Sequence, residues 1–308
     1  MDTRMSEAKP TPLHVLISLY PGYGLGDAVQ MSAVLQHVRK YRPHWIIDYQ
    51  ADEGRHQVGR GIARHTFPYR SIFPTPRYDV SVQICLYDTW ANWGDRPNTR
   101  VSSTLHEVFD LPWDAECGRY QVNISADAIR MAWQVLPTCA VALHYRGDSS
   151  PERKDLSHSQ GAEIINTIYQ LQRAPLLLDW RNVWPTRHAR CVMTTGGYPF
   201  SQEWGRDAEM NCAVIAQCEA FVGIDSGPGK CASATKTPAL IVWTGHHPAP
   251  FHDPSPNTTH LVPAGYHGLE PVCNNRGVID WFEANYSVRH YTGDPVPAIQ
   301  KWLREVLT

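Results

Sequence analysis

The chain has 308 residues, enough for one large α/β domain or two of moderate size, and 43% of them are hydrophobic and 19% charged, as in ordinary soluble globular proteins. A formal net charge of −2 gives no global basic field that would attract nucleic acid or an anionic membrane. The eight cysteines are scattered without a C-x-x-C pair, and there is neither a secretory leader nor an apolar run of about 18 residues. We therefore expect a cytoplasmic protein with no membrane span.

Short apolar runs alternate with helical patterns in the first half of the chain. HVLISLY (14–20) predicts a strand, and DAVQMSAVLQHVRKY (27–41) predicts a helix that Pro43 ends. WIIDYQ (45–50) and VSVQICLY (80–87) predict further strands. Strands that alternate with helices are typical of βαβ units in a parallel sheet.

The second half restarts the same pattern. Strands are predicted at 139–145, 175–180, 191–195, 220–224 and 238–245, and helices at 125–137, 159–173, within 205–218 and at 294–307. We therefore expect an α/β protein with two Rossmann-like domains whose parallel sheets face a central cleft. The predicted boundaries are a flexible tail at 1–12, an N-terminal domain at 13–137 and a C-terminal domain at 138–308. The amphipathic last helix is a candidate to pack back on the N-terminal domain.

The turn in GIDSGPGKCASA follows the apolar run AFV and has the composition of a phosphate-binding turn. Ser226, Gly227 and Gly229 allow a close approach of the backbone to a ligand, and Lys230 adds a positive charge. It is not a P-loop, because the first glycine of that motif is missing and a cysteine follows the lysine. The alternative is a tight turn in which Asp225 or Ser226 caps a helix.

The turn in PGYGLGDAV carries a candidate catalytic carboxylate. Its glycines, which include Gly24 and Gly26, are spaced G-x-G-x-G, so that it is a weak dinucleotide fingerprint. Asp27 follows at the expected start of a helix and at the carboxyl end of the first strand. One interpretation is an N-cap; the other is a carboxylate that projects toward a ligand and acts as a general base.

Two polar loops add candidate ligand-binding residues. HYRGDSSPERKDLS opens the second half with hydroxyls and cations that could share a diphosphate, namely Arg146, Ser149, Ser150, Arg153 and Lys154. The alternative is a solvated charged loop. DTWANWGDRPNTR offers flat aromatic rings that could stack on a sugar, with cations that could contact an anionic acceptor, namely Trp90, Trp93, Arg96 and Arg100.

A histidine-rich stretch, WTGHHPAPFHDPSPNTTH, allows three interpretations. Its candidate ligands are His246, His247, His252, Asp253 and His260. The prolines exclude a helical H-E-x-x-H arrangement, and the spacing fits no known metal site. We therefore expect no metal, and interpret the stretch as lining for a nucleotide or sugar pocket or as a polar loop.

Taken together, these turns resemble the heptosyltransferase-like glycosyltransferases, family nine of the GT-B class. Gly26 and Asp27 match the glycine and aspartate that open the first helix in that family. GIDSGPGKCASATKTPALIVWTG matches its D-S/T-G turn, small-residue helix and T-P strand, at Asp225, Ser226, Gly227, Thr237 and Pro238. The hydroxyl-and-lysine loop that opens the second domain is matched by Ser149, Ser150 and Lys154. Lys230 departs from the family, which often has histidine there.

The resemblance implies an inverting, metal-independent transfer of a sugar from a nucleoside-diphosphate sugar, often ADP-heptose, to an acceptor hydroxyl on a glycan, protein, small molecule or modified nucleobase. Asp27 would be the general base, and no cofactor would be needed beyond the donor substrate. The residues expected at the donor phosphates are Arg146, Ser149, Ser150, Lys154, Asp225, Ser226, Gly227, Pro228, Gly229 and Lys230. The first domain would present the acceptor.

Two other functions stay open from the sequence. One is an NAD-type oxidoreductase or nucleotide-sugar epimerase, in which Asp48 or Asp52 near the second strand would hold the ribose. The glycine spacing and the second phosphate-type turn argue against it. The other is a non-catalytic nucleotide-sugar-binding protein, which would bind the donor without transfer or hydrolysis.

Overall fold

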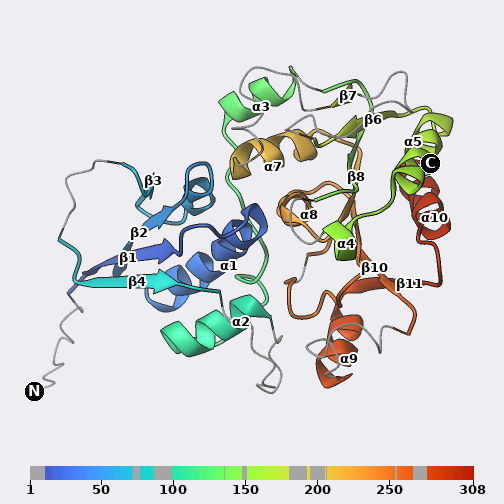
Figure 1. Cartoon of the computed structure of the whole chain (residues 1–308). Helices are drawn as coiled ribbons and strands as arrows, with labels where there is room; N and C mark the ends of the chain where they lie inside the picture. The colour runs from blue at the N-terminus through green and yellow to red at the C-terminus, as the bar shows by residue number, and fades with distance from the viewer. Residues whose placement is uncertain are drawn as a thin grey trace, which may run out of the picture.

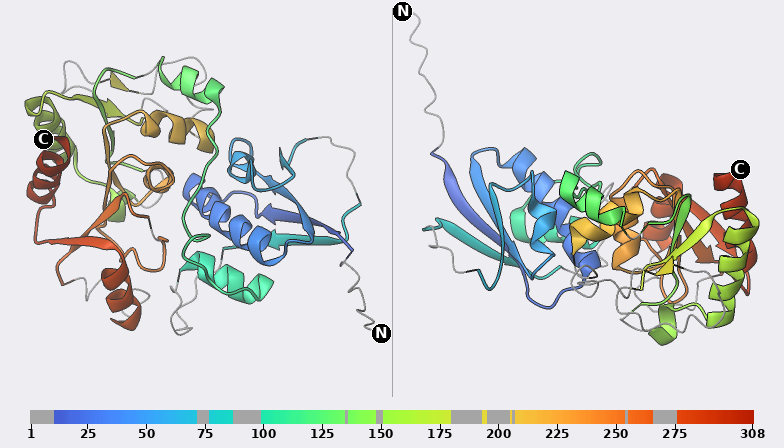
Figure 2. Two further views of the ribbon diagram at one scale, coloured as in Figure 1. Left: turned by 180° about the vertical axis from the view of Figure 1, so that it is seen from behind. Right: turned by 90° about the horizontal axis from the view of Figure 1, so that it is seen from above.

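The computed structural model describes residues 11–71, 77–86, 99–134, 136–147, 151–179, 193–194, 205, 207–253, 255–265 and 276–308. Within these residues the chain forms two parallel β-sheets with helices packed against them (Figures 1 and 2). This confirms the predicted α/β class with two Rossmann-like sheets. No helix in the described part of the chain combines the length and the apolar character needed to cross a membrane.

The first sheet has four strands in the order β3-β2-β1-β4. Its strands are β1 (Leu13–Leu19), β2 (Trp45–Ala51), β3 (His65–Pro68) and β4 (Val80–Ile84), and its helices are α1 (Leu25–Tyr41), η1 (His56–Gly59), α2 (Arg100–Thr104) and η2 (Leu105–Phe109). Val15, Ile17 and Leu19 alternate along β1 and are buried. Side chains two residues apart in a strand point to the same face of the sheet, so these three residues lie on one face. The helices pack on that face and supply the other half of the core.

The second sheet has seven strands in the order β11-β10-β9-β8-β5-β6-β7. Its strands are β5 (Ala140–His144), β6 (Ala174–Leu177), β7 (Met193–Thr194), β8 (Ala220–Ile224), β9 (Ala239–Val242), β10 (Thr258–Pro263) and β11 (Ser287–Tyr291). The helices that follow η2 along the chain are α3 (Ala126–Ala132), α4 (Pro151–Lys154), α5 (His158–Gln170), α7 (Ala208–Ala216), α8 (Gly227–Ser233), α9 (Arg276–Asn285) and α10 (Val296–Leu307). β8 and β9 are buried along their whole length, as strands covered on both faces are.

The terminal helix α10 packs on the second domain. It contacts α5 and β8, and its apolar face belongs to the same core cluster as β5 and β8. Figure 1 shows α10 beside α5 on the outer side of the second sheet. The sequence made this helix a candidate to pack on the N-terminal domain. In the structure, the side chains of Ile299, Trp302 and Leu303 pack against α5 and β8 of the second domain.

The two sheets are joined by one continuous apolar cluster. It includes Val15 and Val34 from the first domain and Cys212, Ala232 and Phe221 from the second. Helices α1, α7 and α8 lie between the sheets in Figures 1 and 2, and α1 is in contact with α8 and α7, while α3 packs on α7. The amino ends of α1 and α8 are thereby brought together, one from each domain.

Candidate functional site

The contact between α1 and α8 depends on two glycines. A Cβ atom on Gly227 would lie 2.8 Å from Cβ of Leu25 and 3.1 Å from the backbone nitrogen of Gly26, and one on Gly26 would lie 3.3 Å from Cα of Gly227. These separations are below ordinary van der Waals contact, so the two helix starts meet backbone to backbone. The two turns singled out in the sequence therefore lie against each other where the two domains meet.

We expect Gly227→Ala to lower the free energy of unfolding by about 1–3 kcal/mol, because the new methyl group would push α1 away from α8. Thermal or urea unfolding measures this. Gly147→Ala is the matched control: its Cβ would lie an ordinary 3.5 Å from Cδ1 of Ile224, so that neutral or slightly higher stability is expected. Equal effects of the two substitutions would contradict the close helix contact.

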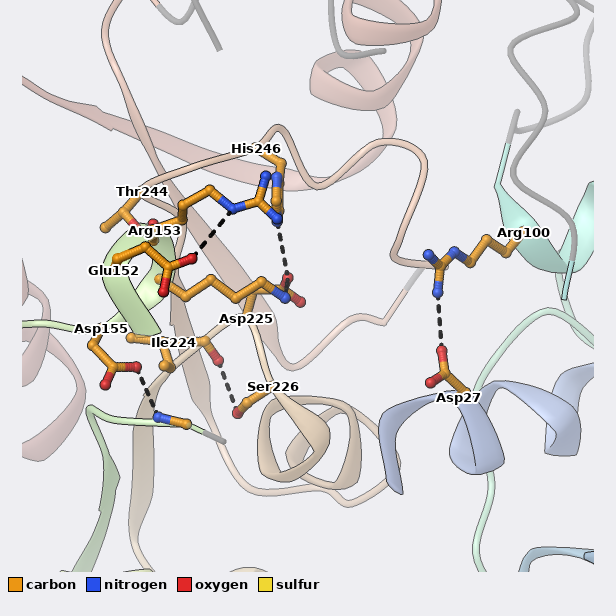
Figure 3. A network of polar contacts seen from close by, with 12 residues as sticks. Asp27, Arg100, Glu152, Arg153, Asp155, Ile224, Asp225, Ser226, Thr244 and His246 are labelled. Carbon is orange, nitrogen blue, oxygen red and sulfur yellow. Dashed lines mark hydrogen bonds and ion pairs between the residues drawn. The ribbon is translucent and has the colours of Figure 1, made fainter. Parts of the chain in front are cut away.

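Asp27 lies in the first turn of α1 with both carboxylate oxygens engaged. Oδ2 accepts a hydrogen bond from the backbone N–H of Gly24 at 3.0 Å, as a helix-capping carboxylate does. Oδ1 accepts from Nη1 of Arg100 at 3.0 Å (Figure 3). The same oxygen accepts from the side-chain amide of Gln30 at 3.4 Å. The Asp27 side chain is 21% exposed. The capping contact that the sequence allowed is therefore present, and the role of Asp27 as a general base stays a prediction.

The turn before α8 places Ser226 at the N-cap, as one interpretation of the sequence predicted. Its hydroxyl, however, donates to the carbonyl oxygen of Ile224 at 3.2 Å and makes no capping hydrogen bond to the helix. Pro228 lies in the first turn, where the absence of an N–H costs nothing.

Lys230 is the most unusual charge in the site. The residue is only 6% exposed, and its Cδ lies 3.2 Å from the position of a Cβ on Gly26. Burial lowers the pKa of the ammonium, and the negative charges of Asp225 and Asp27 offset part of that effect. Within the described residues, neither carboxylate comes within 4.0 Å of it. Lys230 is therefore a buried cation whose charge is offset at longer range by two carboxylates.

Asp225 binds the second lysine. Nζ of Lys154 lies 2.9 Å from its Oδ2, and Nε2 of His246 lies 4.0 Å from the same oxygen (Figure 3). Burial alone would raise the pKa of Asp225, but Lys230 and Lys154 outweigh it and hold the pKa below its usual value. Asp225 is therefore an ionised anchor that places Lys154 of α4 beside the start of α8.

The α4 segment is fixed against the loop after β9. The hydroxyl of Thr244 donates to the carbonyl oxygen of Arg153 at 2.5 Å, and a Cβ on Gly245 would lie 2.9 Å from that oxygen. The Nδ1 atom of His246 is buried, and no described residue hydrogen-bonds to it. Burial lowers the pKa of His246, so the imidazole is neutral near pH 7.

Arg146 is bound within its own loop. Its Nε donates to Oδ2 of Asp155 at 3.2 Å, and its Nη1 lies 2.5 Å from Nε2 of His158. The other oxygen of Asp155 accepts from the backbone N–H of Gly147. Arg146 thus shapes the loop before α4, and its contact with a donor stays a prediction.

Arg100, a candidate for contact with an anionic acceptor, lies beside Asp27. Its guanidinium pairs with that carboxylate and lies over the Phe251 ring, with 4.9 Å between the guanidinium carbon and the ring centroid. Its contact with an acceptor stays a prediction. Its backbone N–H donates to the carbonyl oxygen of Pro250. The other predicted candidates of that loop and of the donor loop, Trp90, Trp93, Arg96, Ser149 and Ser150, lie outside the described residues.

The histidine-rich stretch is a buried aromatic cluster, so the polar-loop interpretation was wrong. The indole N–H of Trp243 donates to Nδ1 of His260 at 3.0 Å, and the His252 and His260 rings are 4.7 Å apart. Burial lowers the pKa of His247 and of His252 to about 3. Of the five candidates only His246 faces the Asp225 site; among the described residues, no three histidine, cysteine or acidic side chains gather around a common metal position.

Asp48 and Asp52, the candidates to hold the ribose in a dinucleotide enzyme, both bind other residues of the chain. Asp48 is 1% exposed and accepts two hydrogen bonds from Arg64 and one from the Tyr78 hydroxyl. Asp52 accepts from the backbone N–H of Gly22 and pairs with Arg55. Neither position offers a free carboxylate for the two hydroxyls of a ribose, which weakens the oxidoreductase alternative.

No family model and no curated protein matches this chain. Solved structures do match it. A family 9 glycosyl transferase from Veillonella parvula shares 12% identity with a TM-score of 0.65, over 91% of this chain and 98% of that one. The E. coli ADP-heptose LPS heptosyltransferase II shares 13% identity with a TM-score of 0.60, over 88% and 98%. E. coli heptosyltransferase WaaC with ADP-2-deoxy-2-fluoro heptose shares 15% identity with a TM-score of 0.51, over 87% and 99%. The chain therefore has the GT-B fold of these glycosyltransferases.

Proposed function

We propose that this chain, with the fold of the family 9 glycosyltransferases, is an inverting and metal-independent glycosyltransferase that moves a sugar from a nucleoside-diphosphate sugar to an acceptor hydroxyl. The observation that carries the proposal is the buried ammonium of Lys230, which interacts with the negative charges of Asp225 and Asp27 where α8 of one domain meets α1 of the other. In the proposed site this ammonium binds the donor diphosphate beside the carboxylate that takes the acceptor proton. Six free cysteines in the described residues fit a reducing cytoplasm.

In the proposed reaction, Asp27 takes the proton of the acceptor hydroxyl as that oxygen forms a bond to the anomeric carbon. The bond from that carbon to the diphosphate oxygen breaks, and its electron pair leaves with the nucleoside diphosphate. Lys230 and Lys154 stabilise the growing negative charge, and the amide groups at the start of α8 add to this. Arg100 orients the carboxylate of Asp27.

The donor proposed is ADP-heptose or a close analogue. The support comes from the solved structures that share the fold, which include a heptosyltransferase named for ADP-heptose and another with ADP-2-deoxy-2-fluoro heptose. Lys154 and Lys230, which come from different elements and both act on the charge of Asp225, support a donor that carries a diphosphate. The acceptor is proposed only as a hydroxyl compound.

Thermal unfolding against ADP, UDP, GDP, CDP, their sugar conjugates and NAD tests the donor. A ligand at 100 times its dissociation constant stabilises the fold by about 2.7 kcal/mol, a shift of a few degrees. We expect the largest shift with ADP or ADP-heptose, followed by slow donor hydrolysis detected as released ADP. A shift with NAD alone would overturn the proposal, and donor binding without transfer or hydrolysis would favour the non-catalytic alternative.

A further inference from the structure

A buried carboxyl group joins the two domains on the α2 side of the site. The Thr99 hydroxyl donates to Oδ1 of Asp253 at 2.7 Å, and the Tyr120 hydroxyl donates to its Oδ2 at 3.1 Å. The backbone N–H of Asp253 in turn donates to the Tyr120 oxygen at 3.0 Å. Thr99, Tyr120 and Asp253 are 1%, 5% and 0% exposed. Thr99 and Tyr120 belong to the first domain, and Asp253 lies after β9 in the second.

This contact bears directly on Arg100. Thr99 is the N-cap of α2, where its side chain accepts from the backbone N–H of Ser102, and Arg100 is the first residue of that helix. The backbone N–H of Arg100 donates to Pro250, three residues before Asp253. The same short loop therefore fixes both the cap of α2 and the residue whose guanidinium pairs with Asp27.

We propose that Asp253 is a positioning residue, which holds α2 on the second domain and thereby keeps Arg100 at Asp27. We call the set of Asp253, Thr99 and Tyr120 the α2 latch. When the latch opens, α2 moves away from the 250–253 loop and Arg100 leaves the carboxylate, while the apolar contact of α1 with α7 and α8 keeps the domains together. The effect of the α2 latch on turnover rests on the proposed function, but its effect on α2 does not.

The α2 latch responds to pH. Burial raises the pKa of Asp253 to about 6 from 3.8, although the Thr99 and Tyr120 hydroxyls oppose the shift. Opening hydrates the carboxyl and returns its pKa toward 3.8, so the closed form holds the proton more tightly. Closure is therefore favoured as pH falls through 6 and weakens above it. Between pH 8 and pH 5 the closed form gains about tenfold over the open form.

Among the described residues, three other titratable groups face Asp253. Burial lowers the pKa of His252 to about 3 and raises that of Tyr286, on α9, well above its ordinary value, so neither changes charge between pH 5 and 8. The remaining group is Lys230 on α8, whose charge opposes part of the shift of Asp253. The Asp253→Asn variant shows which of the two groups causes a pH response, because it removes the carboxyl of Asp253 and leaves Lys230 in place.

Hydrogen exchange of the α2 amides, corrected for intrinsic rates, tests the α2 latch without any substrate. We expect Tyr120→Phe to raise exchange in α2 at least tenfold, while Tyr49→Phe, which removes a buried hydroxyl with no partner among the described residues, leaves it unchanged. In the unmodified protein, exchange should rise about tenfold from pH 5 to pH 8, and Asp253→Asn should abolish this change. Equal exchange in the two Tyr→Phe variants, or a pH response that survives in Asp253→Asn, would overturn the proposal.

Turnover gives a second measurement. We expect Tyr120→Phe to lower kcat ten- to hundredfold with donor affinity unchanged, because only the position of Arg100 is lost. Thr99→Ser keeps the hydroxyl and should keep both exchange and kcat. If neither the unmodified protein nor a variant shows transferase activity, the exchange results alone still test whether the α2 latch holds α2. A Tyr120→Phe variant that combines fast exchange with normal kcat would show that the α2 latch does not position Arg100.

Discussion

Asp27→Asn is expected to lower kcat by about 10²–10⁴-fold, because the amide can no longer take the proton of the acceptor hydroxyl. The substitution is isosteric, and its oxygen can still face Arg100 or accept from the backbone N–H of Gly24. The nucleotide-induced shift in Tm should therefore stay close to that of the unmodified protein. Steady-state kinetics and thermal unfolding of the same preparation measure the two effects.

Asp127→Asn is the matched control for this prediction. Asp127 also lies in the first turn of a helix, α3, but its side chain is 77% exposed and pairs with Arg130 of the same helix. Its replacement should leave kcat unchanged. Turnover by Asp27→Asn within a few-fold of normal would remove Asp27 from the role of base, and an equal loss in both variants would mean that helix stability, and not proton transfer, is being measured.

Lys230→Met is expected to abolish the nucleotide-induced shift in Tm and to lower the Tm of the unliganded protein. Methionine has a similar length but no charge, so the carboxylates of Asp225 and Asp27 lose the ammonium near them. Removing one partner from a set of buried charges costs about 3–5 kcal/mol, because the charge that stays buried is left uncompensated. The ligand contribution of about 2.7 kcal/mol at 100 times the dissociation constant should disappear with the ammonium.

Lys236→Met serves as the control, because Lys236 follows α8 closely but is exposed. It should alter neither Tm nor the nucleotide shift. A Lys230→Met variant that keeps the full ADP-induced shift in Tm would show that the ammonium only supports the interface through Asp225 and Asp27, and does not bind a phosphate.

Much of the fold could be predicted from periodicity. The strand at 14–20 and the helix at 27–41 correspond to β1 and α1, since buried alternation and helical spacing are local properties of the sequence. β10 and β11 were not predicted: TTHLVP was interpreted as the end of a polar loop, although Thr258, His260 and Val262 are buried in a sheet. Both strands are fixed by pairing, β10 with β9 and β11 with β10, and no local pattern in these polar segments indicates those partners.

The candidate site, like the fold, could be predicted only in part. Asp27 and Lys230 could be found from the glycine turns that precede them. The pairing of Arg100 with Asp27 could not, because 73 residues separate the partners and no local pattern links them. The role of Asp253 was missed for a further reason: an aspartate among histidines and prolines suggests a metal ligand, whereas its partners are hydroxyl groups of the other domain.

The apolar cluster that passes from β1 and α1 to α7, α8 and β8 has a consequence for how such a chain can evolve. Neither half presents a finished surface, since Val34 on one side and Ala232 on the other belong to the same interior. Separating the halves would expose this shared interior to water, so we expect neither half to fold stably on its own. A substitution in α7 or α8 that changes the donor or acceptor must therefore also preserve the packing against α1.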